Sequence, residues 1–243
     1  MQKYILLHHE AAARFGDRLT AYGFTPVPLL PDARLNHIVA AHADTLIADG
    51  IGWAPITNAD TAAYLPEPVR AAILTTDDTP SGGYPADCAF NALALGACVY
   101  ARRASLAASV RAAAETAGRR IVDVRQGYAK CSTLALPSRN AAVTADAGMA
   151  DAMEANGVQV LRIRPGHIAL AGCDYGFIGG AAFADDPVQC CSLHAKPAVY
   201  FFGDLLRHPD GAAIAQFLAA KGFDAVSLGG ALTDYGSAVV VVG

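Results

Sequence analysis

The sequence predicts an α/β protein in which five ββαβ units close into a ring, with residues 1–243 forming a single domain. Three observations lead to this prediction. The same order of elements, namely two short strands, a helix and a third strand, recurs along the chain. Short segments that open with a polar residue and continue with apolar ones recur at nearly equal spacing. Finally, the last unit has a strand but no helix after it.

The clearest unit lies between residues 131 and 164. Its helix is expected to begin after Asp146, whose side chain can cap the first turn, and to end at Asn156-Gly157. The predicted elements are a strand over 131–136, a turn over 137–140, a strand over 141–145, this helix, and an alternating strand over 158–163.

Two further units repeat this order. In the unit over 88–124, Ser105 is expected to cap a helix that stops at Gly118. In the unit that starts at Gly176, His208-Pro209 is expected to open a helix that stops at Lys221-Gly222. The strands expected in these two units cover residues 88–93, 97–101, 121–124, 198–202 and 223–228.

The first and last units are expected to differ from the others. Residues 50–68 contain three prolines and no good helix pattern, so we expect a loop in the first unit. Only residues 236–242 remain for the last unit, but residues 3–30 supply its missing parts. We expect a strand over 3–8, a helix over 10–21 and a strand over 24–30. Pairing the last strand of the chain with the first would close the ring and remove exposed sheet edges.

Five polar residues open the units, at intervals of 43, 43, 44 and 60 residues: Asp44, Asp87, Lys130, Asp174 and Asp234. An insertion over 184–196, which contains the pair Cys190-Cys191, accounts for the longer last interval. A doubly wound α/β domain also alternates strands and helices, but it predicts neither the equal spacing nor a final strand without its helix. In equivalent positions these side chains would meet near the axis, where four acids and one base would attract a cation. The alternative is that each Asp only caps the turn before its strand.

Composition excludes several classes of protein. The net charge is −4 and no basic stripe is present, so we expect no nucleic-acid partner. The longest segment without a charged residue, 88–101, has 14 residues, too few to span a bilayer, and we expect a cytoplasmic protein without a membrane partner. The six cysteines form no C-x-x-C pair, so we expect free thiols, no metal site and no cofactor.

Five ββαβ units in a closed ring resemble the pentein fold. That fold includes arginine and agmatine deiminases, dimethylargininase, amidinotransferases and a non-enzymatic ribosome anti-association factor. The resemblance covers almost the entire chain and rests on the repeat pattern. Locally, the sequence also resembles an uncharacterised family of bacterial hypothetical proteins, through the motifs Gly127-Tyr-Ala-Lys-Cys-Ser132, Val143-Thr-Ala-Asp146, Arg164-Pro-Gly-His-Ile-Ala-Leu-Ala-Gly-Cys-Asp-Tyr-Gly-Phe-Ile-Gly-Gly180, His208-Pro209-Asp210 and Leu232-Thr-Asp-Tyr-Gly-Ser237.

The candidate nucleophile is Cys131, because the cation of Lys130 beside it can lower the pKa of the thiol. Adjacent strand residues face opposite sides, however, so a buried structural thiol is the alternative interpretation. His167, in Gly166-His-Ile-Ala, resembles the catalytic histidine of deiminases in Gly-His-Ile-Asp. We take it, His208 and Asp174 as further candidate catalytic residues, and the other openers, Asp44, Asp87, Lys130 and Asp234, as candidate substrate-binding residues.

Two functions remain open at this point. One is an enzyme acting on a small cationic amidine or guanidine compound, held by the acidic cluster and attacked by Cys131. The other is a non-catalytic ring that binds a ligand or a protein. In deiminases the nucleophilic cysteine belongs to the last unit, where this sequence has Tyr235-Gly236-Ser237, and this favours binding. The clustered acids favour a small-molecule site.

Overall fold

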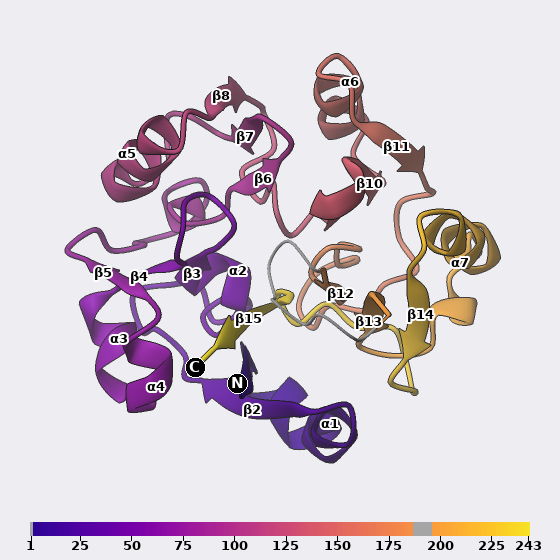
Figure 1. The fold of residues 1–243 in the computed structure, drawn as a ribbon, viewed down its shortest axis with the longest axis horizontal. Coiled ribbons are helices and arrows are strands. Elements are labelled where there is room, and N and C mark those ends of the chain that lie inside the picture. Colours follow the sequence, from indigo (N-terminus) through magenta and orange to yellow (C-terminus); the bar gives the residue numbers. More distant parts are fainter. Residues whose placement is uncertain (1, 187–195) are drawn as a thin grey trace.

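The computed structural model describes residues 2–186 and 196–243. Its strands form five three-stranded sheets, arranged around a ring with the longer helices on the outside (Figure 1). In every sheet the central strand pairs antiparallel with one neighbour and parallel with the other. The predicted five-fold α/β architecture is therefore confirmed. Residues 187–195 of the predicted insertion, including Cys190 and Cys191, lie outside the described residues.

The units follow one another along the chain. The sheets are β3 (Ile47–Ala48), β4 (Ile56–Asn58) and β5 (Leu74–Thr76); β6 (Leu93–Leu95), β7 (Cys98–Ala101) and β8 (Arg120–Asp123); β9 (Thr133–Leu136), β10 (Ala141–Thr144) and β11 (Gln159–Arg162); β12 (Ala182–Asp185), β13 (Ala198–Phe201) and β14 (Asp224–Ser227); and β15 (Ala238–Val242), β1 (Lys3–His8) and β2 (Phe24–Leu29). The helices are α1 (His9–Ala21), α2 (Ala43–Leu46), α3 (Ala59–Tyr64), α4 (Glu67–Arg70), α5 (Ala108–Thr116), α6 (Ala147–Glu154) and α7 (Gly211–Ala220), with short 3₁₀ turns over Ala86–Cys88, Pro137–Arg139 and Leu205–Arg207.

The two ends of the chain build one unit together. Strand β15 pairs antiparallel with β1, from Lys3 opposite Val242 to Leu7 opposite Ala238, and β1 pairs parallel with β2. The N- and C-terminal ends accordingly lie close together (Figure 1). The sequence-based prediction that the last strand closes the ring is confirmed.

Helix α1 shows how a unit buries its core. Ala11, Phe15 and Leu19 recur at every fourth position, so they share one face of the helix, and this face packs against Ile5 and Leu7 of β1. Gly23, with a φ of 87°, adopts the left-handed conformation that ends the helix and turns the chain into β2.

The first unit differs from its prediction. Residues 50–68 were expected to form a loop, but they contain β4, α3 and the beginning of α4. The side chain of Asn58 caps α3 by accepting a hydrogen bond from the Thr61 N–H. Pro66 precedes α4 and Pro68 lies in its first turn, where the missing N–H costs nothing. The prolines therefore start a helix in this unit.

Three other boundaries also shift. Strand β6 begins only at Leu93, because residues 86–88 form a 3₁₀ turn. Helix α5 begins at Ala108, so Ser105 lies in the preceding turn and does not cap it. Helix α7 likewise begins at Gly211, after His208-Pro209.

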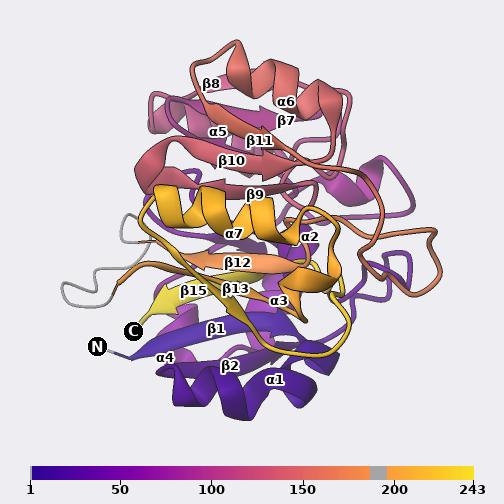
Figure 2. The same ribbon diagram turned by 90° about the vertical axis from the view of Figure 1, so that its right-hand side faces the viewer.

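The first strands of the units lie nearest the axis, since β6 contacts β9, β9 contacts β12, and β12 contacts β15. Viewed from the side, the strands run roughly along the axis of the ring (Figure 2). The segments that enter the first strands consequently converge around the axis. Among residues 2–186 and 196–243, no helix has both the length and the apolar character needed to cross a membrane.

Candidate functional site

Hydrogen bonds join neighbouring units around the axis, just before their first strands. Going around the ring, Asp44 N–H donates to Gly236 C=O (3.0 Å), Ser237 N–H to Gly180 C=O (2.8 Å), Gly180 N–H to Cys131 C=O (2.9 Å), and Cys131 N–H to Asn91 Oδ1 (3.3 Å). Each of the five units contributes to this belt. Its side chains are therefore held in place by the closure of the ring itself.

Four side chains from three units meet inside this belt, and we call them the axial cluster: His42, Asp44, Cys131 and Asp234. The Cys131 thiol donates to the Asp234 carboxylate, with Sγ 3.4 Å from Oδ2 and 3.6 Å from Oδ1. Donor atoms of His42, Asp44 and Cys131 all lie within 4.8 Å of one another. None of the four residues is more than 3% exposed. Imidazole, thiol and two carboxyl groups thus share one buried volume.

The chain folds tightly around Asp234. Its Oδ2 accepts from the Phe177 N–H (2.8 Å) and its Oδ1 from the Gly236 N–H (2.9 Å). A Cβ atom on Gly180 would lie 1.9 Å from Asp234 Oδ1, and one on Gly176 would lie 2.4 Å from the Asp234 Cβ. Both positions therefore require glycine, because any side chain there would displace the carboxylate.

Asp44 accepts fewer hydrogen bonds than Asp234 does. Its Oδ1 accepts from the Thr45 hydroxyl (3.3 Å), whereas Oδ2 has no hydrogen-bond partner among residues 2–186 and 196–243. Burial, followed by the charge of Asp234, raises the pKa of Asp44 to about 7. Burial also raises the pKa of Asp234 to about 6, against the opposing effect of its backbone hydrogen bonds. Both carboxyl groups consequently titrate near neutral pH.

The thiol and the imidazole are uncharged in this environment. Burial, followed by the charges of Asp234 and Asp44, raises the pKa of the Cys131 thiol well above its ordinary value. Burial lowers the pKa of His42 to about 4. His42 can therefore accept a proton, and Cys131 needs a nearby positive charge to become a thiolate.

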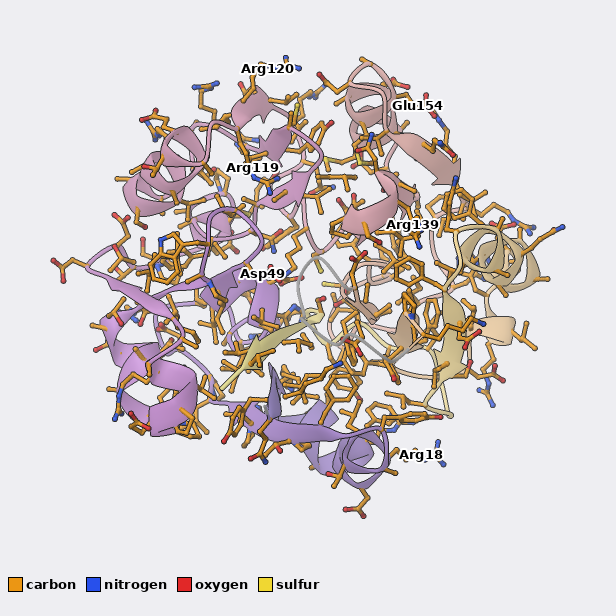
Figure 3. The ribbon with its side chains drawn as sticks, in the orientation of Figure 1. Arg18, Asp49, Arg119, Arg120, Arg139 and Glu154 are labelled. Carbon is orange, nitrogen blue, oxygen red and sulfur yellow. The ribbon has the colours of Figure 1, made fainter. Side chains whose placement is uncertain are left out.

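Lys130 supplies a cation next to the cluster. Its Nζ forms an ion pair with Asp49, and its charge lowers the pKa of Asp44. Asp49 follows the two-residue strand β3 and lies near the middle of the ring, whereas Arg18 and Arg120 lie at its outer edge (Figure 3). A cavity of about 50 Å³ borders Lys130 and Asp49 and is large enough to hold water.

Asp87 lies at the border of the axial cluster. It accepts a hydrogen bond from the Tyr128 hydroxyl (2.6 Å) and one from the Cys88 thiol (3.3 Å). Burial, together with Asp87, raises the pKa of both donors. The charge of Asp44 also raises the pKa of Cys88. Asp87 thus has two hydrogen-bond partners within the protein, and its place in the substrate-binding set stays a prediction.

Asp174 does not join the other openers. It is exposed and lies eight residues before β12, whereas Asp44 and Lys130 each lie three residues before their strands. The entry segment of the fourth unit is longer, so equal spacing in sequence does not give an equivalent position. Gly179 and Gly180 occupy the corresponding place beside Cys131.

His167 and His208 are paired with each other in the fourth unit. Their ring centroids lie 5.7 Å apart, and the Arg164–Asp210 ion pair lies beside them. His208 is buried and its Nδ1 accepts from the Asp210 N–H (3.0 Å). The histidine near the Cys131 thiol is instead His42, which the sequence analysis missed. The sequence offered one indication of this histidine: it lies two residues before Asp44, one of the five polar residues that begin the units.

Five ββαβ units around an axis define a pentein-like α/β propeller, with a thiol, an imidazole and two carboxyl groups at its centre. The chain belongs to a family of unknown function, DUF6873, whose model matches residues 6–239. A search of the curated proteins finds no match. The chain is similar to the crystal structure of a dimethylarginine dimethylaminohydrolase adduct with 4-chloro-2-hydroxymethylpyridine. This similarity has a TM-score of 0.52 and 12% sequence identity, covers 94% of this chain and 93% of the other, and shows the shared fold.

Proposed function

We propose that the axial cluster binds a small amidine or guanidinium compound and that Cys131 attacks its central carbon. One observation carries this proposal: the Cys131 thiol lies 3.4 Å from the Asp234 carboxylate, with Asp44 and His42 close by. Planar amidinium groups donate paired hydrogen bonds to carboxylates, so two acids suit such a ligand. The similar structure is that of a protein named for hydrolysing dimethylarginine, which supports this substrate class.

Binding of a cation would change the chemistry of the thiol. The two carboxylates raise the pKa of Cys131, and a positive charge between them would offset this effect. The same charge would keep Asp44 and Asp234 ionised, although burial raises the pKa of both. The substrate would therefore help to form the thiolate that attacks it.

The proposed reaction then needs only one proton carrier. His42 takes the proton from Cys131, and the thiolate forms a C–S bond to the amidine carbon. The C–N bond to the leaving amine breaks as His42 returns the proton to that nitrogen. Water then attacks the central carbon of this thiouronium (or, from an amidine, thioimidate) as His42 takes a proton from it. The C–S bond breaks, the sulfur takes a proton to restore the thiol, and the product is a urea or amide; the remaining proton leaves on the released amine as ammonium. Overall, one water is consumed and one amine or ammonium ion is released.

A second candidate function is the non-catalytic ring. The observation that favours it is the burial of the cluster, in which Cys131 is 3% exposed and its thiol pKa is raised. A protein of this kind would use the belt for stability and would bind its partner elsewhere. The two candidates differ in whether a small cation reaches Cys131.

The test is alkylation by 2-chloroacetamidine and by its neutral analogue 2-chloroacetamide. Cys173 is exposed and serves as an internal reference for the intrinsic reactivity of the two reagents. Peptide mass spectrometry gives the ratio of the two rates at each cysteine. If the cluster recognises amidines, this ratio is at least about tenfold larger at Cys131 than at Cys173, and Asp44→Asn reduces it.

Two results would overturn the proposal. Modification of Cys173 without any at Cys131 would reject the enzyme in favour of the non-catalytic ring. Equal ratios at the two thiols would show that the acids do not recognise the cation. A positive result is followed by assaying ammonium or amine release from guanidinium compounds, which Cys131→Ser must abolish.

A further inference from the structure

We infer that the axial cluster is also a binding site for a divalent transition metal of the zinc type. Its donors are an imidazole nitrogen, a thiol sulfur and carboxylate oxygens, which is the ligand set that zinc prefers. The donor atoms of His42, Asp44 and Cys131 already lie within 4.8 Å of one another. This inference rests on the geometry of the cluster and does not depend on the proposed catalytic function.

The distances between Cys131 and Asp234 fit tetrahedral coordination. With Zn–S near 2.3 Å and Zn–O near 2.0 Å, a tetrahedral site places sulfur and oxygen roughly 3.5 Å apart. Cys131 Sγ lies 3.4 Å from Oδ2 and 3.6 Å from Oδ1 of Asp234. Asp234 therefore lies close enough to Cys131 to supply a fourth ligand, and His42, Asp44 and Asp234 would complete the site by moving toward one point.

A second, independent observation points to a missing cation. Asp44 is 0% exposed, yet its Oδ2 has no hydrogen-bond partner among residues 2–186 and 196–243. A buried polar atom without a partner is costly, and a metal ion at this position would satisfy it. The other oxygen is already oriented by the Thr45 hydroxyl, as expected for a ligating carboxylate with an outer partner.

The carboxylate of Asp234 is oriented in the same way. Its oxygens accept from the N–H groups of Phe177 and Gly236, which fix the carboxylate and leave lone pairs directed elsewhere. These backbone donors would form the outer shell of the site without any rearrangement of the chain.

The donor set also determines which metals fit. Magnesium and calcium require six or more oxygen ligands, and a site with a thiol, an imidazole and two carboxylates offers too few. With the thiol deprotonated, the ligands carry three negative charges, which Zn²⁺ offsets in part, with Lys130 nearby. The site should therefore select zinc or cobalt over the alkaline-earth ions.

Metal and amidine would compete for the same residues. A bound metal ion holds the Cys131 sulfur as thiolate and occupies the space between the two acids. The zinc-bound protein should accordingly resist alkylation at Cys131, while the exposed Cys173 reacts as before. Zinc would then act as a reversible block of the thiol.

The experiment is a titration of the full chain, stripped of metal with EDTA, with Co²⁺ as a spectroscopic probe. We expect one Co²⁺ per chain, a thiolate-to-cobalt charge-transfer band, and displacement by Zn²⁺ but not by Mg²⁺ or Ca²⁺. Cys131→Ser should abolish the band, and Asp44→Asn should weaken zinc binding at least about tenfold. Circular dichroism checks that each variant is folded.

Two matched variants separate this site from other thiols. Cys173→Ser and the double variant Cys190→Ser/Cys191→Ser should retain the band and the stoichiometry. A band that survives Cys131→Ser but disappears in either control would overturn the inference, as would the absence of any band or equal binding of Ca²⁺. The amidine labelling is therefore also done in the presence of EDTA, so that the inference and the proposed function can fail separately.

Discussion

Replacing Asp44 with Asn should stabilise the protein at high pH and much less at low pH. The carboxyl of Asp44 is fully buried, and its pKa is raised to about 7 from an ordinary value of 3.8. Between these two pH values the folded protein holds a proton that the unfolded chain has lost. The stability that protonated Asp44 provides is therefore complete below pH 3.8 and is lost as the pH rises to about 7.

The size of this loss follows from the two pKa values. At about 1.4 kcal/mol per pKa unit, ionisation of buried Asp44 costs roughly 4 kcal/mol once the pH exceeds 7. About 3 kcal/mol of this cost arises between pH 5 and pH 8. Asn has nearly the shape of the protonated carboxyl and does not titrate, so Asp44→Asn avoids the loss.

The assay is urea unfolding at pH 5 and pH 8 in the presence of EDTA. Relative to the wild type, Asp44→Asn should gain about 3 kcal/mol in its free energy of unfolding between these pH values. Asp77→Asn removes one charge at an exposed position and should show no such gain. An Asp44→Asn effect of the same size at both pH values would refute the reasoning, because it would mean that Asp44 titrates like an exposed acid.

Three further predictions concern the centre and the closure of the ring. Lys130→Met leaves the partly buried carboxylate of Asp49 unpaired and should cost roughly 1–3 kcal/mol in urea unfolding, most of which Lys130→Met/Asp49→Asn should restore; no recovery in the double variant would contradict the ion pair. Gly180→Ala places a methyl group against the Asp234 carboxylate and should lower the free energy of unfolding by about 1–3 kcal/mol or more. Gly83→Ala is the control, because its methyl group meets no atom within 4 Å and should change the free energy of unfolding little. Deleting residues 238–243 removes β15 from its pairing with β1 and should abolish cooperative thermal unfolding; an unchanged melting temperature would show that this strand does not close the ring.

The repeated units could be predicted from sequence because each unit carries its own hydrophobic periodicity, helix caps and turn residues within a short stretch of the chain. Strands, turn and helix of the unit over 131–164 lie close together in the chain, so their periodicity and caps indicate them directly. The first unit was missed because its prolines lie before and within the first turn of α4, where they are compatible with a helix.

The site was harder to predict, because it is formed by residues from different units. Lys130 and Cys131 were expected to face opposite sides of a strand. The structure places both in the turn before β9, where strand alternation does not apply. Lys130 therefore reaches Asp49 while Cys131 contacts Asp234. The carboxylate partners come from the first and fifth units, and no spacing within one unit could reveal them.

The most direct test of the axial cluster is a ¹³C NMR titration of the aspartate carboxyl carbons in metal-free protein. Two resonances should titrate with pKa values of about 6 and about 7, and they should be assigned by their loss in Asp234→Asn and Asp44→Asn. Removing the thiol in Cys131→Ala should perturb both resonances, because the Cys131 side chain interacts with both acids. If every aspartate instead titrated near pH 4 and Cys131→Ala left all of them unchanged, the buried cluster would not exist as described.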